Sequence, residues 1–199
     1  MTSSVELTQD LVRFNTINPP GAERACAETL AALLKERGFT VDVVPFGDGR
    51  AQIVARIGGA PGKLPIGFTG HLDTVPLGAQ PWSVDPHAGA IVDGKLYGRG
   101  SSDMKSGVAA FVVAALQLSD KLADTPGVVL VITAGEETGC TGAAALAQEF
   151  KDLPKVGAFV VAEPTGNRPL VGHKGALWLE AVTKGLTAHG SMPEKGVNA

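Results

Sequence analysis

Apolar positions along the first half of the chain follow two different periods, one helical and one typical of strands. Residues 4–16 and 22–38 carry apolar side chains at helical spacing, with Ser4 as the expected cap of the first helix and Gly38 at the end of the second. Three short apolar runs between glycine and proline residues predict strands, at 39–46, 51–58 and 64–70.

The next stretch continues this alternation with more strongly apolar segments. Residues 104–119 are apolar almost all round and predict a buried helix, while 127–135 and 156–164 read as strands covered on both faces. Residues 140–150 predict a further helix, and Asp93-Gly94 predicts a tight hairpin turn. The fold expected is α/β, with a mostly parallel central sheet and flanking helices.

The pattern changes after about residue 170. Residues 175–185 alternate apolar and other side chains, as in a half-solvated strand of an antiparallel sheet. We therefore expect one domain over 1–174 and the beginning of a second over 175–199. The last residues resemble the approach to a helix, so we expect a truncated chain or one that stops inside its second domain.

Composition and charge narrow the classes of function. The 199 residues are 44% hydrophobic and 19% charged, as in soluble globular proteins. A net charge of -3 without a basic patch argues against a nucleic-acid partner, and the lack of a long apolar run or polybasic segment argues against a membrane. Cys26 and Cys140 form no CxxC pair, which predicts free thiols and a cytoplasmic location.

Proton-active side chains follow the predicted strands at the points where they end: His71, Asp73, Glu136, Glu137 and Glu163. Asp103 instead lies in a glycine-rich segment directly before the predicted buried helix. Ligands of open α/β sheets bind beyond the carboxyl ends of the strands, so these residues predict one shared site. An imidazole with several carboxylates suits Zn²⁺, Mn²⁺ or Co²⁺. Asp73 is placed to accept the second N–H of His71, and adjacent glutamates allow one metal ligand beside one general base.

Each of these residues also has a purely structural interpretation. A single buried histidine is more often hydrogen-bonded than metal-bound, and Asp103 and Glu137 stand where helix caps occur. Glu163 could be a surface acid at a strand end, and Asp73 a turn residue. The glycine-rich segment 98–107 lacks the GxxxxGK[ST] spacing, which excludes a phosphate loop.

Five motifs in fixed order decide between these interpretations: GHLDTVP (70–76), DGKLYGRGSSDMKSG (93–107), TAGEETG (133–139), AEPT (162–165) and AHGSMPEKGVNA (188–199). Together they resemble the dizinc amidohydrolases that include acetylornithine deacetylase, succinyl-diaminopimelate desuccinylase and carboxypeptidase G. The resemblance implies a zinc aminopeptidase-like catalytic domain in 1–174. It further implies that 175–199 begin an inserted α+β lid, or dimerisation, domain.

The same resemblance assigns roles to individual residues. It implies two zinc ions per site, replaceable by Co²⁺ or Mn²⁺, with the metal ligands His71, Asp103, Glu137 and Glu163. His71 and Glu163 would hold one ion, Glu137 the other, and Asp103 would bridge them. The peptide bond between Asp103 and Met104 would be cis. The catalytic residues implied are Glu136 as general base, Asp73 as the group that orients His71, and His189 as an oxyanion donor to a partner subunit.

The implied activity is hydrolysis of the amide bond in an N-acyl amino acid, as in acetylornithine deacetylase, or in a dipeptide. A small molecule would be the substrate and a homodimer the full-length assembly. In this family a last histidine ligand comes from a returning segment, and no histidine follows His189. The alternative is therefore a truncated, non-catalytic fragment that binds metal or a partner chain without turnover.

Overall fold

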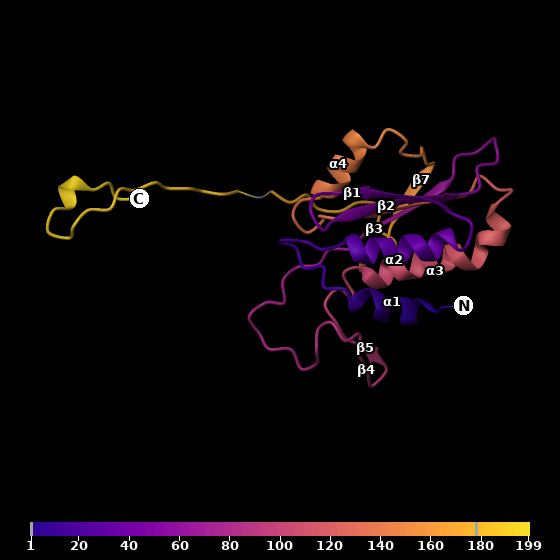
Figure 1. Ribbon diagram of the computed structural model, residues 1–199, viewed down its shortest axis with the longest axis horizontal. Helices are drawn as coiled ribbons and strands as arrows, with labels where there is room; N and C mark the ends of the chain where they lie inside the picture. Colours follow the sequence, from indigo (N-terminus) through magenta and orange to yellow (C-terminus); the bar gives the residue numbers. More distant parts are fainter. Residues whose placement is uncertain (1, 178) are drawn as a thin grey trace. The chain divides into compact units, whose positions relative to one another are not determined.

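The computed structural model describes residues 2–177 and 179–199 and comprises two compact units, one ending at Gly166 and one spanning Asn167–Ala199 (Figure 1). The helices are α1 (Ser4–Val12), α2 (Arg24–Lys35), α3 (Lys105–Leu122), α4 (Thr141–Glu149) and the short η1 (Pro193–Lys195). The strands are β1 (Thr40–Pro45), β2 (Ala51–Ile57), β3 (Ile66–His71), β4 (Ile91–Val92), β5 (Lys95–Leu96), β6 (Val128–Thr133) and β7 (Ala158–Val161). The domain assignment 1–174 and 175–199 stays a prediction.

Five strands form the central sheet in the order β1-β2-β6-β3-β7, which confirms the α/β class with flanking helices. The sheet is mixed rather than mostly parallel: β3 runs parallel to β6 and β7, whereas the β1–β2 and β2–β6 pairs are antiparallel. Only five residues, 46–50, connect β1 to β2. A connection this short returns the chain as a hairpin, since parallel neighbours need a long crossover.

Helices cover both faces of the sheet. Figure 1 shows α2 and α3 on one face, with α1 packed on α3, and α4 on the other. The larger core lies on the α2–α3 face, and a smaller cluster of Val54, Val129, Val131 and Leu146 lies on the face covered by α4. Every residue of β6 is buried, as its continuous apolar run predicts.

Two smaller features also follow from the sequence. Asp93 and Gly94 both have positive φ and join the antiparallel β4 and β5, which confirms the hairpin. Gly38, at φ +83, ends the turn after α2 as expected. The cap of α1 is Ser3 rather than Ser4, because Ser3 and Glu6 form a reciprocal capping box. Among the described residues, no helix is long and apolar enough to cross a membrane.

Two expectations about strands are wrong. All four residues of β7 are exposed rather than buried, because β7 is an edge strand. In the described parts of 175–185, namely 175–177 and 179–185, no strand forms, and Leu177 and Leu179 are exposed. An alternating pattern becomes a strand only when another strand pairs with it. Residue 178 lies outside the described residues.

Candidate metal site

Parallel pairing brings three polar strand ends together. His71 ends β3, Glu136 and Glu137 follow β6, and Glu163 follows β7. Because β3 lies between β6 and β7 and runs parallel to both, the three carboxyl ends share one edge of the sheet. Asp103 reaches the same edge from the turn before α3, where its peptide bond to Met104 is cis, as the family resemblance implies.

Two glycines allow the helices to approach these strand ends closely. A Cβ atom at Gly107 of α3 would overlap the carbonyl oxygen of Ala162, next to Glu163. Similarly, a Cβ atom at Gly142 of α4 would overlap the carbonyl oxygen of Ala134. Both contacts are with backbone, which cannot move aside as a flexible side chain can. The glycines therefore fix how near each helix lies to the loop that carries an acidic residue.

His71 is buried, with 2% of its side chain exposed. Its Nδ1 atom lies 2.9 Å from the backbone carbonyl oxygen of Asp73 and 3.5 Å from the carboxylate Oδ1 of the same residue. Both oxygens are acceptors, so Nδ1 donates a proton, and Nε2 is the atom presented to the acidic residues. Asp73 thus contacts the ring through both oxygens, with its backbone carbonyl the nearer partner, and its predicted role in orienting His71 stays a prediction.

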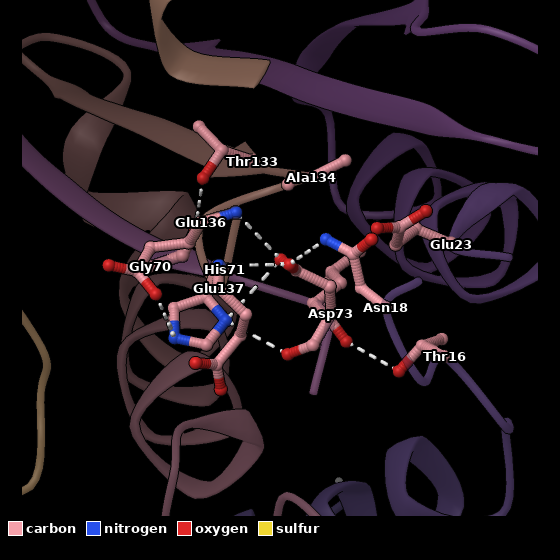
Figure 2. Close-up of polar contacts among 12 residues, drawn as sticks. Thr16, Asn18, Glu23, Gly70, His71, Asp73, Thr133, Ala134, Glu136 and Glu137 are labelled. Atoms are coloured by element: carbon pink, nitrogen blue, oxygen red, sulfur yellow. Dashed lines mark hydrogen bonds and ion pairs between the residues drawn. The ribbon is translucent and has the colours of Figure 1, made fainter. Parts of the chain in front are cut away.

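The Asp73 carboxylate also holds the loop after β6. Oδ1 accepts a hydrogen bond from the backbone N–H of Glu136 and Oδ2 from that of Glu137, each at 3.1 Å (Figure 2). Oδ2 further accepts from Asn18 Nδ2 at 2.8 Å. Burial raises the pKa of Asp73, but the hydrogen bonds with His71, Asn18 and Glu136 outweigh it and lower the pKa to about 2.

Asn18 is a residue of this network that the sequence did not reveal. It is buried, and its amide bridges Asp73 Oδ2 and Thr138 Oγ1, the latter at 3.1 Å. The Asn-Pro-Pro-Gly stretch marks a break after α1, but nothing in it indicates a partner 55 residues away. Asn18 stands out only because it is a polar residue that is buried, and its burial cannot be read from the sequence.

Three carboxylates surround the open side of the imidazole. His71 Nε2 lies 3.3 Å from Asp103 Oδ1, 3.6 Å from Glu136 Oε2 and 3.6 Å from Glu163 Oε1. These separations exceed ordinary N–H···O hydrogen bonds. Tetrahedral ligands bound at about 2.0–2.2 Å lie about 3.3–3.6 Å from one another, so the spacing fits atoms that share one cation.

The donor atoms form two groups around His71. One contains His71, Asp103 and Glu163, the other His71, Glu136 and Glu137, and within each group the ligand atoms lie within 4.8 Å of one another. The nitrogen and oxygen donors match those of zinc sites. The structure thus brings together all six proton-active residues that the sequence singled out, while the division of roles among them stays a prediction.

Electrostatics favour positive charge in this cluster. Burial raises the pKa of Glu163 to about 7, with His71 opposing the shift and the charges of Asp103 and Glu136 adding to it. Burial also raises the pKa of Glu137. For His71, burial lowers the pKa, but hydrogen bonding to Asp73 and the surrounding charges prevail and raise it to about 9. A divalent cation would replace the imidazole proton and neutralise the acids.

His189 belongs to the unit Asn167–Ala199, not to the unit that carries the cluster. It is exposed, and its Nδ1 atom lies 2.9 Å from Ser191 Oγ. Its predicted role at a substrate oxyanion stays a prediction. Cys26 and Cys140 are both free thiols, as their spacing predicts.

Comparison with known proteins agrees with this architecture. A curated relative, succinyl-diaminopimelate desuccinylase 2 of Ruegeria sp. (strain TM1040), is 39% identical over 203 residues, covering 98% of this chain and 50% of the relative. The solved structure of human carnosine dipeptidase 1 has a TM-score of 0.66 and 26% identity, covering 79% of this chain and 37% of that protein.

The fold also matches an M20 family metallo-carboxypeptidase, Sso-CP2 from Sulfolobus solfataricus, with a TM-score of 0.67 and 21% identity over 81% of this chain and 37% of that one. The chain spans about half the length of the curated relatives it matches. Residues 67–176, which include the cluster around His71, match the model of peptidase family M20/M25/M40. The chain belongs to this family, which confirms the resemblance drawn from its motifs.

Proposed function

We propose that the protein of which this chain is part hydrolyses the amide bond of a small N-acyl amino acid or dipeptide with the help of two zinc ions. The observation that carries the proposal is a buried histidine whose Nε2 atom faces carboxylates at the mutual spacing of metal ligands. A purely structural histidine would need only the partner that Nδ1 already has, not several carboxylates around Nε2.

The ligand assignment follows the family resemblance: His71 and Glu163 would hold one ion, Glu137 would hold the second, and Asp103 would bridge them. The group formed by His71, Asp103 and Glu163 supports the first of these two ions. The resemblance also implies one further histidine ligand, from a segment that follows the lid domain in members of the family. Zinc suits this set of nitrogen and oxygen donors, and Co²⁺ or Mn²⁺ would bind with the same ligands. When bound, the metal polarises the amide carbonyl and makes an attacking water more acidic.

Glu136 is the residue that would move the proton. Its backbone N–H is held by Asp73, while its side chain is 38% exposed, so the carboxylate is accessible from solvent. It would take a proton from the attacking water and deliver it to the departing amine nitrogen. Asp73 keeps the Nδ1 proton of His71 in place, and His189 of a partner subunit in a homodimer would donate to the oxyanion.

The nature of the acyl group rests on the comparisons. The motifs alone favour a substrate like N-acetylornithine. The curated relatives carry desuccinylase names at 39% and 38% identity, which favours an N-succinyl amino acid. Both substrates offer the same scissile amide and a free carboxylate, and they differ in the charge of the acyl group.

The test is a substrate panel on the zinc-loaded, full-length protein, with N-succinyl, N-acetyl and dipeptide substrates. Glu136→Gln should retain its zinc and lower kcat about 10²–10⁴-fold, the usual contribution of a general base. Glu36→Gln, an exposed acid at the end of α2, is the matched control. Wild-type kcat in Glu136→Gln would contradict the assignment.

The 199-residue chain should be assayed beside the full-length protein. Metal binding without turnover in the chain alone is expected if the missing histidine ligand is required. That result, beside amide hydrolysis by the full-length protein, would support the alternative for the chain itself, a non-catalytic fragment that binds metal without turnover. Metal binding without turnover in the full-length protein would contradict the proposed function.

A further inference from the structure

A buried ion pair lies beneath the loop that carries Glu136 and Glu137. Arg50 Nε donates to Glu23 Oε2 at 2.8 Å, and Nη2 donates to Glu23 Oε1 at 2.6 Å. The side chain of Glu23 is fully buried, and that of Arg50 is 15% exposed. The two-pronged contact fixes the plane of the guanidinium as well as its position.

The guanidinium is enclosed by backbone on two sides. A Cβ atom at Gly21 would lie 2.5 Å from Arg50 Nε. One at Gly135 would lie 3.3 Å from Nη2, farther than from Thr141 Oγ1 at 2.7 Å and the Phe46 ring at 3.0 Å. The guanidinium carbon also lies 4.9 Å from the centre of the Phe46 ring. Gly135 directly precedes Glu136, while Gly21 closes the turn that begins at Ile17 and contains Asn18. Arg50 thus contacts both the acidic loop and the turn that holds Asp73.

Stability alone does not account for this pair. Withdrawing two charges from water costs several kcal/mol per ion, and apolar replacements of equal volume are often as stable. The rigid fork binds a carboxylate with both prongs, so the plane of the guanidinium is defined for the groups that pack on it. The charge of Asp73 also contributes to raising the pKa of Arg50, after the larger effect of Glu23, so the cation lies within electrostatic reach of the site.

We propose that Glu23 and Arg50 are a positioning pair for the metal site, with the guanidinium forming part of the surface on which Gly135 packs, beside Phe46 and Thr141. The pair thereby places Glu136 and Glu137 at the distance from His71 that metal binding requires. This inference rests on the proposed function, because it concerns the same site. It assigns no contact with substrate or metal to either residue.

A second ion pair in the same unit provides a control. Arg56 Nη1 lies 3.1 Å from Asp42 Oδ2, and both side chains are about 40% exposed on β2 and β1. Arg50→Lys and Arg56→Lys make the same chemical change, keeping the charge and removing the fork. Only the first alters the support of Gly135.

The test is Co²⁺ or Zn²⁺ affinity, measured by equilibrium dialysis well below the unfolding temperature of each variant. A loss of global stability alone leaves affinity unchanged under these conditions. We expect Arg50→Lys to bind metal about 10–100-fold more weakly, the usual effect of residues that position ligands, and Arg56→Lys to match the wild type. In the full-length protein kcat should fall with the affinity.

A pair of glycine variants tests the same contact from the other side. Gly21 and Gly38 both have φ +83, so alanine strains the backbone similarly at each. A methyl group at Gly21 meets the guanidinium, whereas at Gly38 it meets no atom within 4 Å. Gly21→Ala should therefore weaken metal binding and Gly38→Ala should not.

The inference is overturned if Arg50→Lys binds metal as Arg56→Lys does, or if Gly21→Ala and Gly38→Ala bind equally. Failure of both Arg50→Lys and Gly21→Ala to fold would make the pair a purely structural element and would also overturn it. If the wild type itself binds no metal, the proposed function fails instead.

Discussion

The two ring nitrogens of His71 face environments of opposite character. On the Nδ1 side, Asp73 is fully buried, and its carboxylate accepts hydrogen bonds from two backbone amides and Asn18. On the Nε2 side, the side chains of Asp103, Glu136 and Glu163 are 57%, 38% and 35% exposed. The buried side is held by the fold, whereas the open side gathers like charges that repel one another.

This difference distinguishes the groups that the fold positions from the groups that a bound cation would stabilise. The fold fixes the imidazole, the tautomer and the loop after β6 before anything binds. The acids on the open side gain from a positive charge between them, which raises affinity for a cation at the cost of stability without one. In the metal-free protein, substitutions on the buried side should therefore lower the free energy of unfolding strongly, and substitutions on the open side should change it little.

Asp73→Asn should have the largest effect. An amide cannot accept from all the donors that the carboxylate satisfies, so a buried group is left unpaired. We expect a loss of about 2–4 kcal/mol in the free energy of unfolding, since hydrogen bonds to charged groups contribute about 1.5–3 kcal/mol each. Metal affinity should fall about 10–100-fold. Urea unfolding and metal dialysis measure the two effects.

Asp85→Asn is the matched control for that variant, because Asp85 accepts from the backbone N–H of His87 in an exposed turn. Equal metal affinity in Asp73→Asn and Asp85→Asn would remove the distinction between the buried and open sides.

Asn18→Ala should have an intermediate effect. It removes the 2.8 Å hydrogen bond to Asp73 and the contact with Thr138, and we expect a loss of about 1.5–3 kcal/mol in the free energy of unfolding. Asn15→Ala, in the same turn, removes an exposed hydrogen bond to Ile17 and should cost less than about 1 kcal/mol. Chemical denaturation of the two variants side by side tests this; similar losses would show that Asn18 does not support Asp73.

Glu163→Gln should have the smallest effect on the metal-free protein, and of opposite sign. Because the folded-state pKa of Glu163 is raised to about 7 from 4.5, its ionisation destabilises the folded state as pH rises through this range. Glutamine removes that penalty. Since the side chain is 35% exposed, solvent screens the effect, and we expect the Tm to rise by no more than about 2–4 °C at pH 8.

At pH 4 the Tm of Glu163→Gln should approach that of the wild type, since Glu163 is then protonated in the folded state and mostly protonated in the unfolded state. Glu149→Gln, an exposed acid at the end of α4, provides the charge-matched control. Added zinc should reverse the order at pH 8, because the wild type retains the ligand. A lower Tm for Glu163→Gln than for the wild type in metal-free buffer at pH 8 would contradict the charge imbalance.

The sequence predicts much of the open side and little of its support. His71, Glu136 and Glu163 follow apolar runs, so their convergence follows from parallel strands alone. Asn18, Glu23 and Arg50 contact partners that are distant in the sequence, and the local pattern of apolar and polar residues does not indicate such pairs. Residues 156–164 show the same limit, because an apolar run does not reveal whether its strand lies inside the sheet or at its edge.

If the atoms facing His71 Nε2 form a metal site, anomalous X-ray diffraction of zinc-soaked crystals should locate the ion there. We expect an anomalous peak about 2.0–2.2 Å from His71 Nε2 and from carboxylate oxygens of Asp103 and Glu163. Zinc bound elsewhere with His71 Nε2 uncoordinated, or no zinc at saturating concentration, would contradict it.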